Sequence, residues 1–206
     1  MEETGSAADF LPSRITLPAL RDAVQGCRGC ALYENATQAV FGEGARSAAV
    51  MLVGEQPGDQ EDLAGRPFVG PAGKLLDRAL EEAGIDRKSA NVTNPVKHIK
   101  WEARGKRRIH AKPSWSEVAA CRPWLEAELA VVKPTVLVLL GAVAAQGLLG
   151  RQFRVTKQRG ELVDSPLAPH VTATIHPSAI LRGEPADRDR EFSRLVDDLR
   201  KVAALL

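Results

Sequence analysis

The chain has 206 residues, of which 44% are hydrophobic and 26% charged, which is ordinary for one sizeable globular domain. A net charge of +2 is too small to indicate nucleic-acid binding by itself, so DNA binding must come from local cation clusters. No apolar stretch is long enough to span a bilayer, and no secretory signal begins the chain. We therefore expect a cytoplasmic, monomeric protein without a membrane partner.

The N-terminal half alternates apolar runs with helical patterns. Residues 1–13 are acidic and rich in small side chains, and we expect a flexible tail ahead of a single domain at 14–206. A short helix is predicted from Leu17 to Val24, and the apolar run from Ala48 to Val53 suits a buried parallel strand. A helix is predicted over 73–83, because apolar residues recur along one side of it: Leu75, Leu76, Ala79, Leu80 and Ala83.

The second half continues this alternation. A second strand starts at Asn91 and is cut short by Pro95, and Ser114 with Glu117 forms a capping box for a helix that ends near Lys133. The sequence then predicts a strand at 136–140, a small-residue helix at 141–149, a hairpin at 150–165, a strand at 171–175 and a final helix at 188–205. The pattern predicts a three-layer α/β/α fold with a central four-stranded parallel sheet.

Ligands bind beyond the carboxyl ends of parallel strands, so the residues after each strand are the candidates for chemistry. An amide follows the second strand and a histidine follows the fourth, while two carboxylates follow the first. The residues concerned are Gly54, Glu55, Gln56, Asp59, Asn94, Gly141, His176 and Ser178.

Three cations precede a histidine in the polar run from Arg104 to Pro113: Lys106, Arg107, Arg108 and His110. Cations neutralise phosphates, and a histidine can attack, accept a proton or bind metal. The neighbouring positive charges disfavour imidazolium, so we expect His110 to be neutral and nucleophilic at pH 7. On composition alone, such a run is most often a solvated basic loop. A second cation cluster comprises Arg151, Arg154, Lys157 and Arg159.

Cys27 and Cys30 have the spacing C-x-x-C, and Cys121 is remote from them. Without an export signal, metal or redox chemistry is a better expectation than a disulfide framework. The C-x-x-C spacing is by itself a weak signal.

Four segments match known motifs in order and spacing, covering nearly the whole chain from Cys27 onward: residues 54–59, 66–73, 92–97 and 176–178. Together they resemble the uracil-DNA glycosylase superfamily, in its iron–sulfur branch, family 4. Ordinary members of that branch have alanine at the position of Gln56 and lack the insertion from Lys106 to His110. Both departures resemble the UdgX subgroup, which traps its DNA covalently through the histidine of that insertion.

The resemblance implies a site for a uracil that has been flipped out of DNA. Phe68 would stack on the base, Asn94 would bind its N3–H and O4, and His176 would donate to O2 as charge develops there. From the residues alone, Phe68 could be a core side chain, Asn94 a turn former and His176 a strand-end histidine satisfied by the backbone.

Other residues take supporting roles in the same resemblance. Gly54 lets the backbone pass close to the ligand, and Ser178 starts the turn after His176. Arg182 is similar to a residue that holds the DNA or the active-site histidine. Asp59 either contributes a carboxylate to the site or caps a helix.

The resemblance also implies a covalent mechanism. Glu55 would accept a hydrogen bond from His110, which fixes the tautomer and raises the nucleophilicity of the imidazole. As uracil leaves, His110 would capture C1′ before water does, by proximity, and the adduct would persist. Arg107 and Arg108 would position the loop or neutralise phosphates.

The cysteines match three of the four cluster ligands in family 4, and His98 stands at the position of the fourth. The implied cofactor is a structural [4Fe–4S] cluster bound by Cys27, Cys30, His98 and Cys121. Zinc in a Cys₃His site fits the same ligands and is the less expected metal.

The leading expectation is a single-turnover uracil-DNA glycosylase acting preferably on single-stranded DNA and associated with the nucleoid through it. One alternative is an ordinary hydrolytic, multiple-turnover family 4 enzyme whose basic run only clamps DNA. The other is a non-catalytic, metal-stabilised nucleic-acid-binding module, for which Glu55 and His110 would be dispensable in uracil-dependent binding.

Overall fold

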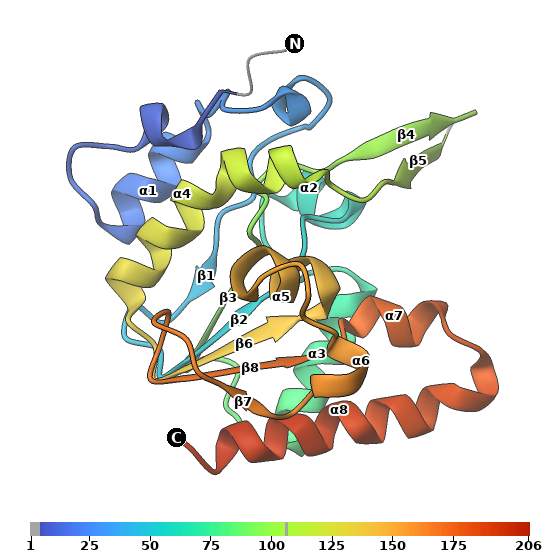
Figure 1. The fold of residues 1–206 in the computed structure, drawn as a ribbon. Coiled ribbons are helices and arrows are strands. Elements are labelled where there is room, and N and C mark those ends of the chain that lie inside the picture. The colour runs from blue at the N-terminus through green and yellow to red at the C-terminus, as the bar shows by residue number, and fades with distance from the viewer. Residues whose placement is uncertain (1–4, 106) are drawn as a thin grey trace.

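The computed structural model describes residues 5–105 and 107–206, so Lys106 of the basic run lies outside the described residues. A six-stranded sheet occupies the centre, in the order β1-β3-β2-β6-β8-β7 (Figure 1). Its four inner strands are parallel, and β1 and β7 are antiparallel at the two edges. The strands are β1 Glu43–Gly44, β2 Val50–Val53, β3 Ala90–Thr93, β6 Val136–Leu140, β7 Leu162–Val163 and β8 His170–Thr174.

The predicted parallel core is confirmed, with a correction at its edges. The four inner strands are the four that the apolar runs predict, and all residues of β2, β3 and β6 are buried. The edge strands have two residues each, which is too short to show a hydrophobic period. The sheet is therefore six-stranded and mixed, rather than four-stranded and purely parallel.

Helices cover both faces of this sheet, which confirms the three layers (Figure 1). One face packs against α1 (Leu17–Val24), α4 (Trp115–Val132), α5 (Gly141–Leu149) and α6 (Val155–Gln158). The other face packs against α3 (Pro71–Glu82), α7 (Pro177–Arg182) and α8 (Arg188–Ala203). In the described part of the chain, no helix is long and apolar enough to cross a membrane.

Local chemistry explains the helix boundaries. Thr16 caps α1, whose bounds are those predicted. The predicted capping box of α4 is confirmed, because Ser114 accepts from the Glu117 N–H and the Glu117 carboxylate accepts from the Ser114 N–H. Lys133 ends α4 in a left-handed conformation with a φ of 50°.

Three segments differ from the sequence-based expectations. The hairpin expected over 150–165 is wrong, because this segment forms α6 followed by β7. The expected tail at 1–13 contains a 3-10 helix, Ala7–Phe10, and Ala7 is fully buried in the core beside α4. The basic run forms a β-hairpin of β4 (Trp101–Arg104) and β5 (Arg107–His110) that projects from the body of the protein (Figure 1).

Candidate active site

The carboxyl ends of β2, β3 and β8 bring four of the candidate residues together. A Cβ atom at Gly54 would lie 2.4 Å from Oδ1 of Asn94 and 2.7 Å from Cζ of Phe68, so both side chains lie against this glycine. The rings of Phe68 and His176 stack with centroids 6.1 Å apart and an interplanar angle of 27°. An aromatic face, an amide and an imidazole thus meet where the parallel strands end.

Phe68 both packs in the core and faces the site. It is 8% exposed and belongs to the core cluster under α3 and α8. Its φ of 57° is unusual for a residue with a side chain. Gly73 allows this conformation, because a Cβ there would lie 1.7 Å from the Phe68 carbonyl oxygen. Strained backbone of this kind is often kept where it places a functional side chain.

A short relay fixes the tautomer of His176. The backbone N–H of Ser178 donates to His176 Nδ1 at 3.1 Å, and the Ser178 hydroxyl lies 2.8 Å from the same atom. Arg182 in turn donates to the Ser178 hydroxyl at 3.0 Å. Because Nδ1 accepts, the proton of the neutral ring lies on Nε2. Burial, together with the charges of Arg182 and His110, lowers the pKa of His176 to about 4.

His110 lies at the end of β5 and contacts Gln56 directly. The Gln56 side-chain oxygen accepts from the Lys100 N–H at 3.0 Å, which leaves its NH₂ group 2.7 Å from His110 Nε2. The same NH₂ group donates to the carbonyl of Ala111 at 2.9 Å. His110 Nε2 is therefore an acceptor, and the ring proton lies on Nδ1.

The expected hydrogen bond from His110 to Glu55 is absent among the described residues, where the ring instead accepts from Gln56 at Nε2. Burial raises the pKa of the Glu55 carboxyl, although the charges of Lys112 and Arg182 oppose this. His110 is exposed as a residue, yet desolvation of its ring lowers its pKa, and the charge of Arg182 adds to this effect. The lowered pKa favours a neutral imidazole at pH 7, as expected, but its largest cause is burial rather than the cations of the basic run.

Arg108 ties the hairpin to α2 (Asp59–Ala64). Its guanidinium lies 2.6 Å from the fully buried Asp62 carboxylate, 3.2 Å from Asp59, and 4.9 Å above the Trp101 ring. The contacts of Arg108 thus position the hairpin, whereas Arg107 is exposed. Asp59 pairs with Arg108 and does not cap α2, because Gly58 occupies the N-cap position.

A buried ion pair that was not predicted from the sequence contacts the backbone of Asn94. Lys97 Nζ donates to Glu128 at 2.5 Å, to the Thr93 hydroxyl at 2.8 Å and to the Asn94 carbonyl at 2.8 Å. Glu128 also accepts from the Gly42 N–H at 3.0 Å. Lys97 is fully buried and Glu128 is 1% exposed. The sequence did contain a signal for a buried charge, because Glu128 is the single acidic residue among the apolar residues 127–132 of α4.

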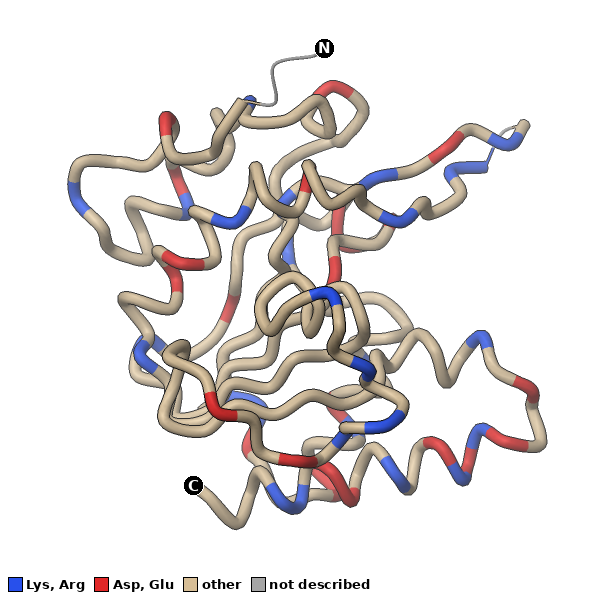
Figure 2. Tube along the Cα trace, viewed as in Figure 1, with Lys and Arg blue, Asp and Glu red and all other residues tan. Residues whose placement is uncertain are grey.

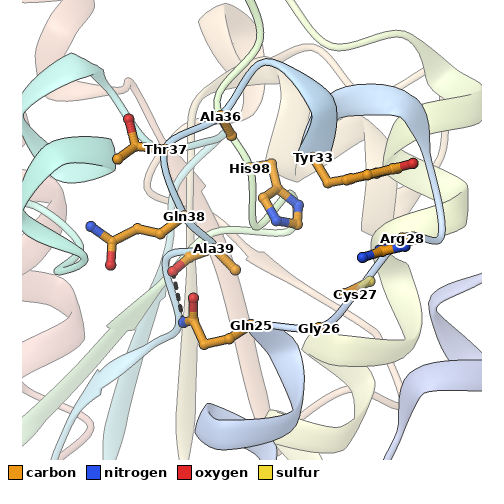
Figure 3. Close-up of a pocket in the computed structure, with 10 residues that line it drawn as sticks. All are labelled: Gln25, Gly26, Cys27, Arg28, Tyr33, Ala36, Thr37, Gln38, Ala39 and His98. Carbon is orange, nitrogen blue, oxygen red and sulfur yellow. Dashed lines mark hydrogen bonds between the residues drawn. The ribbon is translucent and has the colours of Figure 1, made fainter.

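Two of the candidate metal ligands share a cavity. Cys27 and His98 line one cavity of about 170 Å³ between α1 and the loop that precedes β1 (Figure 3). Cys27 Sγ accepts from Trp124 Nε1 at 3.2 Å, and Cys121 Sγ accepts from the Lys97 N–H at 3.3 Å. Burial lowers the pKa of His98 to about 4.

The three thiols are free and lie near enough for the charge of each to act on the others. Burial raises the pKa of Cys121 to about 12. In the described residues no group of three or more histidine, cysteine or acidic side chains is close enough to hold a single metal ion. Of the four predicted ligands, Cys27 and His98 line this cavity, and among the described residues the four do not form a tetrahedral site.

The fold and the site define a class: an α/β protein whose parallel strand ends bring together an aromatic face, an amide and an imidazole. The chain belongs to the uracil-DNA glycosylase superfamily, whose family model matches residues 41–200. This confirms the superfamily resemblance drawn from the four motifs.

Two relatives extend this finding along nearly the whole chain. The type-4 uracil-DNA glycosylase of Thermotoga maritima is 37% identical over 187 residues, covering 90% of this chain and 92% of that protein. The type-4 enzyme of Pyrobaculum aerophilum is 35% identical, covering 86% and 90%. The crystal structure of SMUG2 from Pedobacter heparinus has a similar fold, with a TM-score of 0.55 at 14% identity over 77% of each chain.

Proposed function

We propose that this protein excises uracil from DNA and then becomes linked to C1′ of the abasic site through His110. The relatives named type-4 uracil-DNA glycosylases support the first half of this proposal. The second half rests on the 2.7 Å contact between His110 and Gln56, because Gln56 lies three residues after the end of β2. That contact holds a neutral imidazole beside the residues that would bind the base.

The base-binding half of the site fits a leaving uracil anion. Phe68 offers a ring face, and Asn94 offers an amide that can both donate and accept. His176 presents its Nε2 proton, because Nδ1 is occupied by Ser178. A fixed donor of this kind stabilises the negative charge that develops on uracil as the glycosidic bond breaks.

His110 would then complete the reaction. The electron pair of the C1′–N1 bond leaves with uracil, and the lone pair of the imidazole forms the new bond to C1′. In the free protein the Nε2 lone pair accepts from Gln56, so DNA binding must exchange that contact for C1′. Loss of the Nδ1 proton leaves a neutral alkylated imidazole, which is a poor leaving group. Glu55, whose carboxyl has a raised pKa, is our candidate to take this proton.

A multiple-turnover hydrolase is the second candidate, because the relatives carry only the name of type-4 enzymes. In that case water captures C1′, and the hairpin only holds DNA.

A uracil-containing single-stranded oligonucleotide on a denaturing gel separates the two candidates. We expect a heat- and detergent-resistant shift with the protein, none with His110→Ala, and an unchanged shift with His170→Ala as the matched control. Free abasic product with turnover in the unmodified protein would favour hydrolysis. Absence of uracil release from the unmodified protein would favour the non-catalytic binding module.

We further propose a [4Fe–4S] cluster held by Cys27, Cys30, His98 and Cys121. Each ligand of such a cluster binds a different iron, so the ligands of a cluster lie farther apart than those around one zinc ion. The N–H groups of Lys97 and Trp124 donate to the sulfur atoms of Cys121 and Cys27, and such hydrogen bonds orient and stabilise metal-bound thiolates. When bound, the cluster would supply a structural tie. Iron, sulfide and zinc analysis of the purified protein tests this.

A further inference from the structure

An exposed aromatic–cationic patch lies beside the proposed site and has no role in it. Trp115, the first residue of α4, is 37% exposed, and the Arg151 guanidinium lies 4.9 Å from the centre of its ring. Arg151 comes just after α5, and Arg154 donates to the Arg151 carbonyl at 2.9 Å, which holds this turn in place. Figure 2 shows cations along this connection between α5 and α6.

The patch is firmly attached to the active-site end of the molecule. Gln56, which contacts His110, also accepts from the Lys100 N–H, and the Lys100 ammonium pairs with Glu117 in the first turn of α4. Trp115 is five positions after His110 in the chain, so their Cα atoms are at most about 18 Å apart. Lys112 lies between them in the chain and is close enough for its charge to act on Glu55.

The charges of this surface are available to a ligand. Lys112, Arg151, Arg154 and Lys157 are exposed and form no ion pair with a carboxylate in the described part of the chain. Nearby Lys100 and Arg159 differ, because each is paired with an acidic side chain. An exposed indole flanked by unpaired cations is the combination that binds single-stranded nucleic acid, in which bases stack on the ring and cations follow the phosphates.

We propose that Trp115 and Arg151 form a subsite for the single strand that flanks the uracil, with one unpaired base stacked on the indole and Arg151 at an adjacent phosphate. This inference rests on the proposed function, which supplies the DNA. The subsite explains why an aromatic side chain stays exposed at the start of α4 although the chain is only 4% aromatic. It also makes single-stranded DNA the better substrate, since a paired base cannot stack on protein.

The test is single-turnover uracil release measured against protein concentration, with a long single strand that carries uracil at its centre. We expect Trp115→Ala to raise the half-saturating concentration about tenfold without changing the maximal rate, since stacking acts on binding. Trp115→Phe should restore most of the loss. Arg151→Ala should also weaken binding and lower the slope of log affinity against log salt by about 0.7. Arg122→Ala, which removes a paired cation further along α4, is the matched control.

Strands truncated on one side of the uracil give the decisive comparison. Truncation on the side that reaches the patch should weaken binding to the unmodified protein and leave Trp115→Ala unaffected, because both changes remove the same contact. Additive effects for truncation on either side, or a lower maximal rate with unchanged half-saturation, would overturn the subsite. If the unmodified protein releases no uracil, the proposed function fails, and anisotropy of a labelled uracil-free strand still decides whether Trp115 and Arg151 bind DNA.

Discussion

The two histidines of the site are held by very different parts of the molecule. His176 follows the buried strand β8, and its Nδ1 is fixed by Ser178 and, behind it, Arg182. His110 ends an exposed two-stranded hairpin outside the main sheet, held through Gln56 and Arg108. The comparison indicates that the proposed base-binding residues lie at the strand ends of the main sheet, while the histidine proposed to react lies on a hairpin outside it. Changes behind the strand ends should damage folding, and changes in the hairpin should damage only DNA capture.

The largest effect is expected from Lys97→Met, behind Asn94. The change leaves the Glu128 carboxylate buried without its cation, so we expect the free energy of unfolding to fall by about 3–5 kcal/mol. Urea denaturation measures this. Lys97→Met combined with Glu128→Leu should recover most of the loss, because an apolar pair carries no buried charge. If Lys97→Met alone has a free energy of unfolding within about 1 kcal/mol of that of the unmodified protein, the ion pair is not needed for stability.

Gly54→Ala should lower the rate of uracil release about a hundredfold, because displacing catalytic groups by about 1 Å commonly costs this much. The new methyl group would overlap Oδ1 of Asn94 and the ring of Phe68. Single-turnover kinetics measure the change. Gly147→Ala is the matched control, since its Cβ would lie 3.3 Å from a single methyl group of Val118. Equal rates for both variants would contradict the placement of Asn94 and Phe68 beside Gly54.

Arg108→Ala should slow adduct formation about tenfold and leave uracil release intact, because it loosens the hairpin without touching the base-binding residues. The rate of the denaturing-gel shift, measured beside the rate of uracil release, separates the two effects. Arg107→Ala is the neighbouring control, as Arg107 is exposed. A parallel loss of both activities in Arg108→Ala would mean that hairpin and base-binding site are one unit.

The smallest effect is expected from pH. The pKa of His110 is lowered and that of His176 lies at about 4, so adduct formation should change less than about twofold between pH 8 and 6.5, where ordinary histidines begin to titrate. Below this range, protonation of Glu55, whose pKa is raised, and of His110 should both slow adduct formation.

The free energy of unfolding should also depend on pH, through the protonation of His176. The unfolded chain binds a proton at His176 near pH 6.5 and the folded chain only near pH 4, so the free energy of unfolding falls as pH drops through this window. Denaturation at several pH values, compared with His176→Asn, measures this contribution.

For the adduct rate, a fall to half or less between pH 8 and pH 6.5 would show that the site contains an ordinary, solvated histidine.

The sheet and the strand-end residues could be predicted because their signals are local. The apolar runs 50–53 and 136–140 are buried on both faces, and a residue after a parallel strand must lie at the ligand-binding edge. The capping box of α4 is likewise a short-range pattern of Ser114 and Glu117. For these elements, neighbouring residues decide the structure.

The contacts of the hairpin could not be predicted, because each depends on residues far apart in the chain. Gln56 and Glu55 are adjacent and both polar, and only the path of β5 decides which of them meets His110. Arg108 pairs with Asp62, which is 46 residues away in the chain. The same holds for the buried pair of Lys97 and Glu128 outside the hairpin, whose members are 31 residues apart. The hairpin itself gives little signal, since its two strands have four residues each and are mostly exposed.

The most direct test of the proposed mechanism is to digest the protein after reaction with a uracil-containing single strand and to locate the attached sugar by tandem mass spectrometry. We predict a deoxyribose linked through C1′ to the imidazole of His110, in about one equivalent per protein. An unmodified His110 peptide accompanied by several equivalents of free abasic strand would contradict covalent capture.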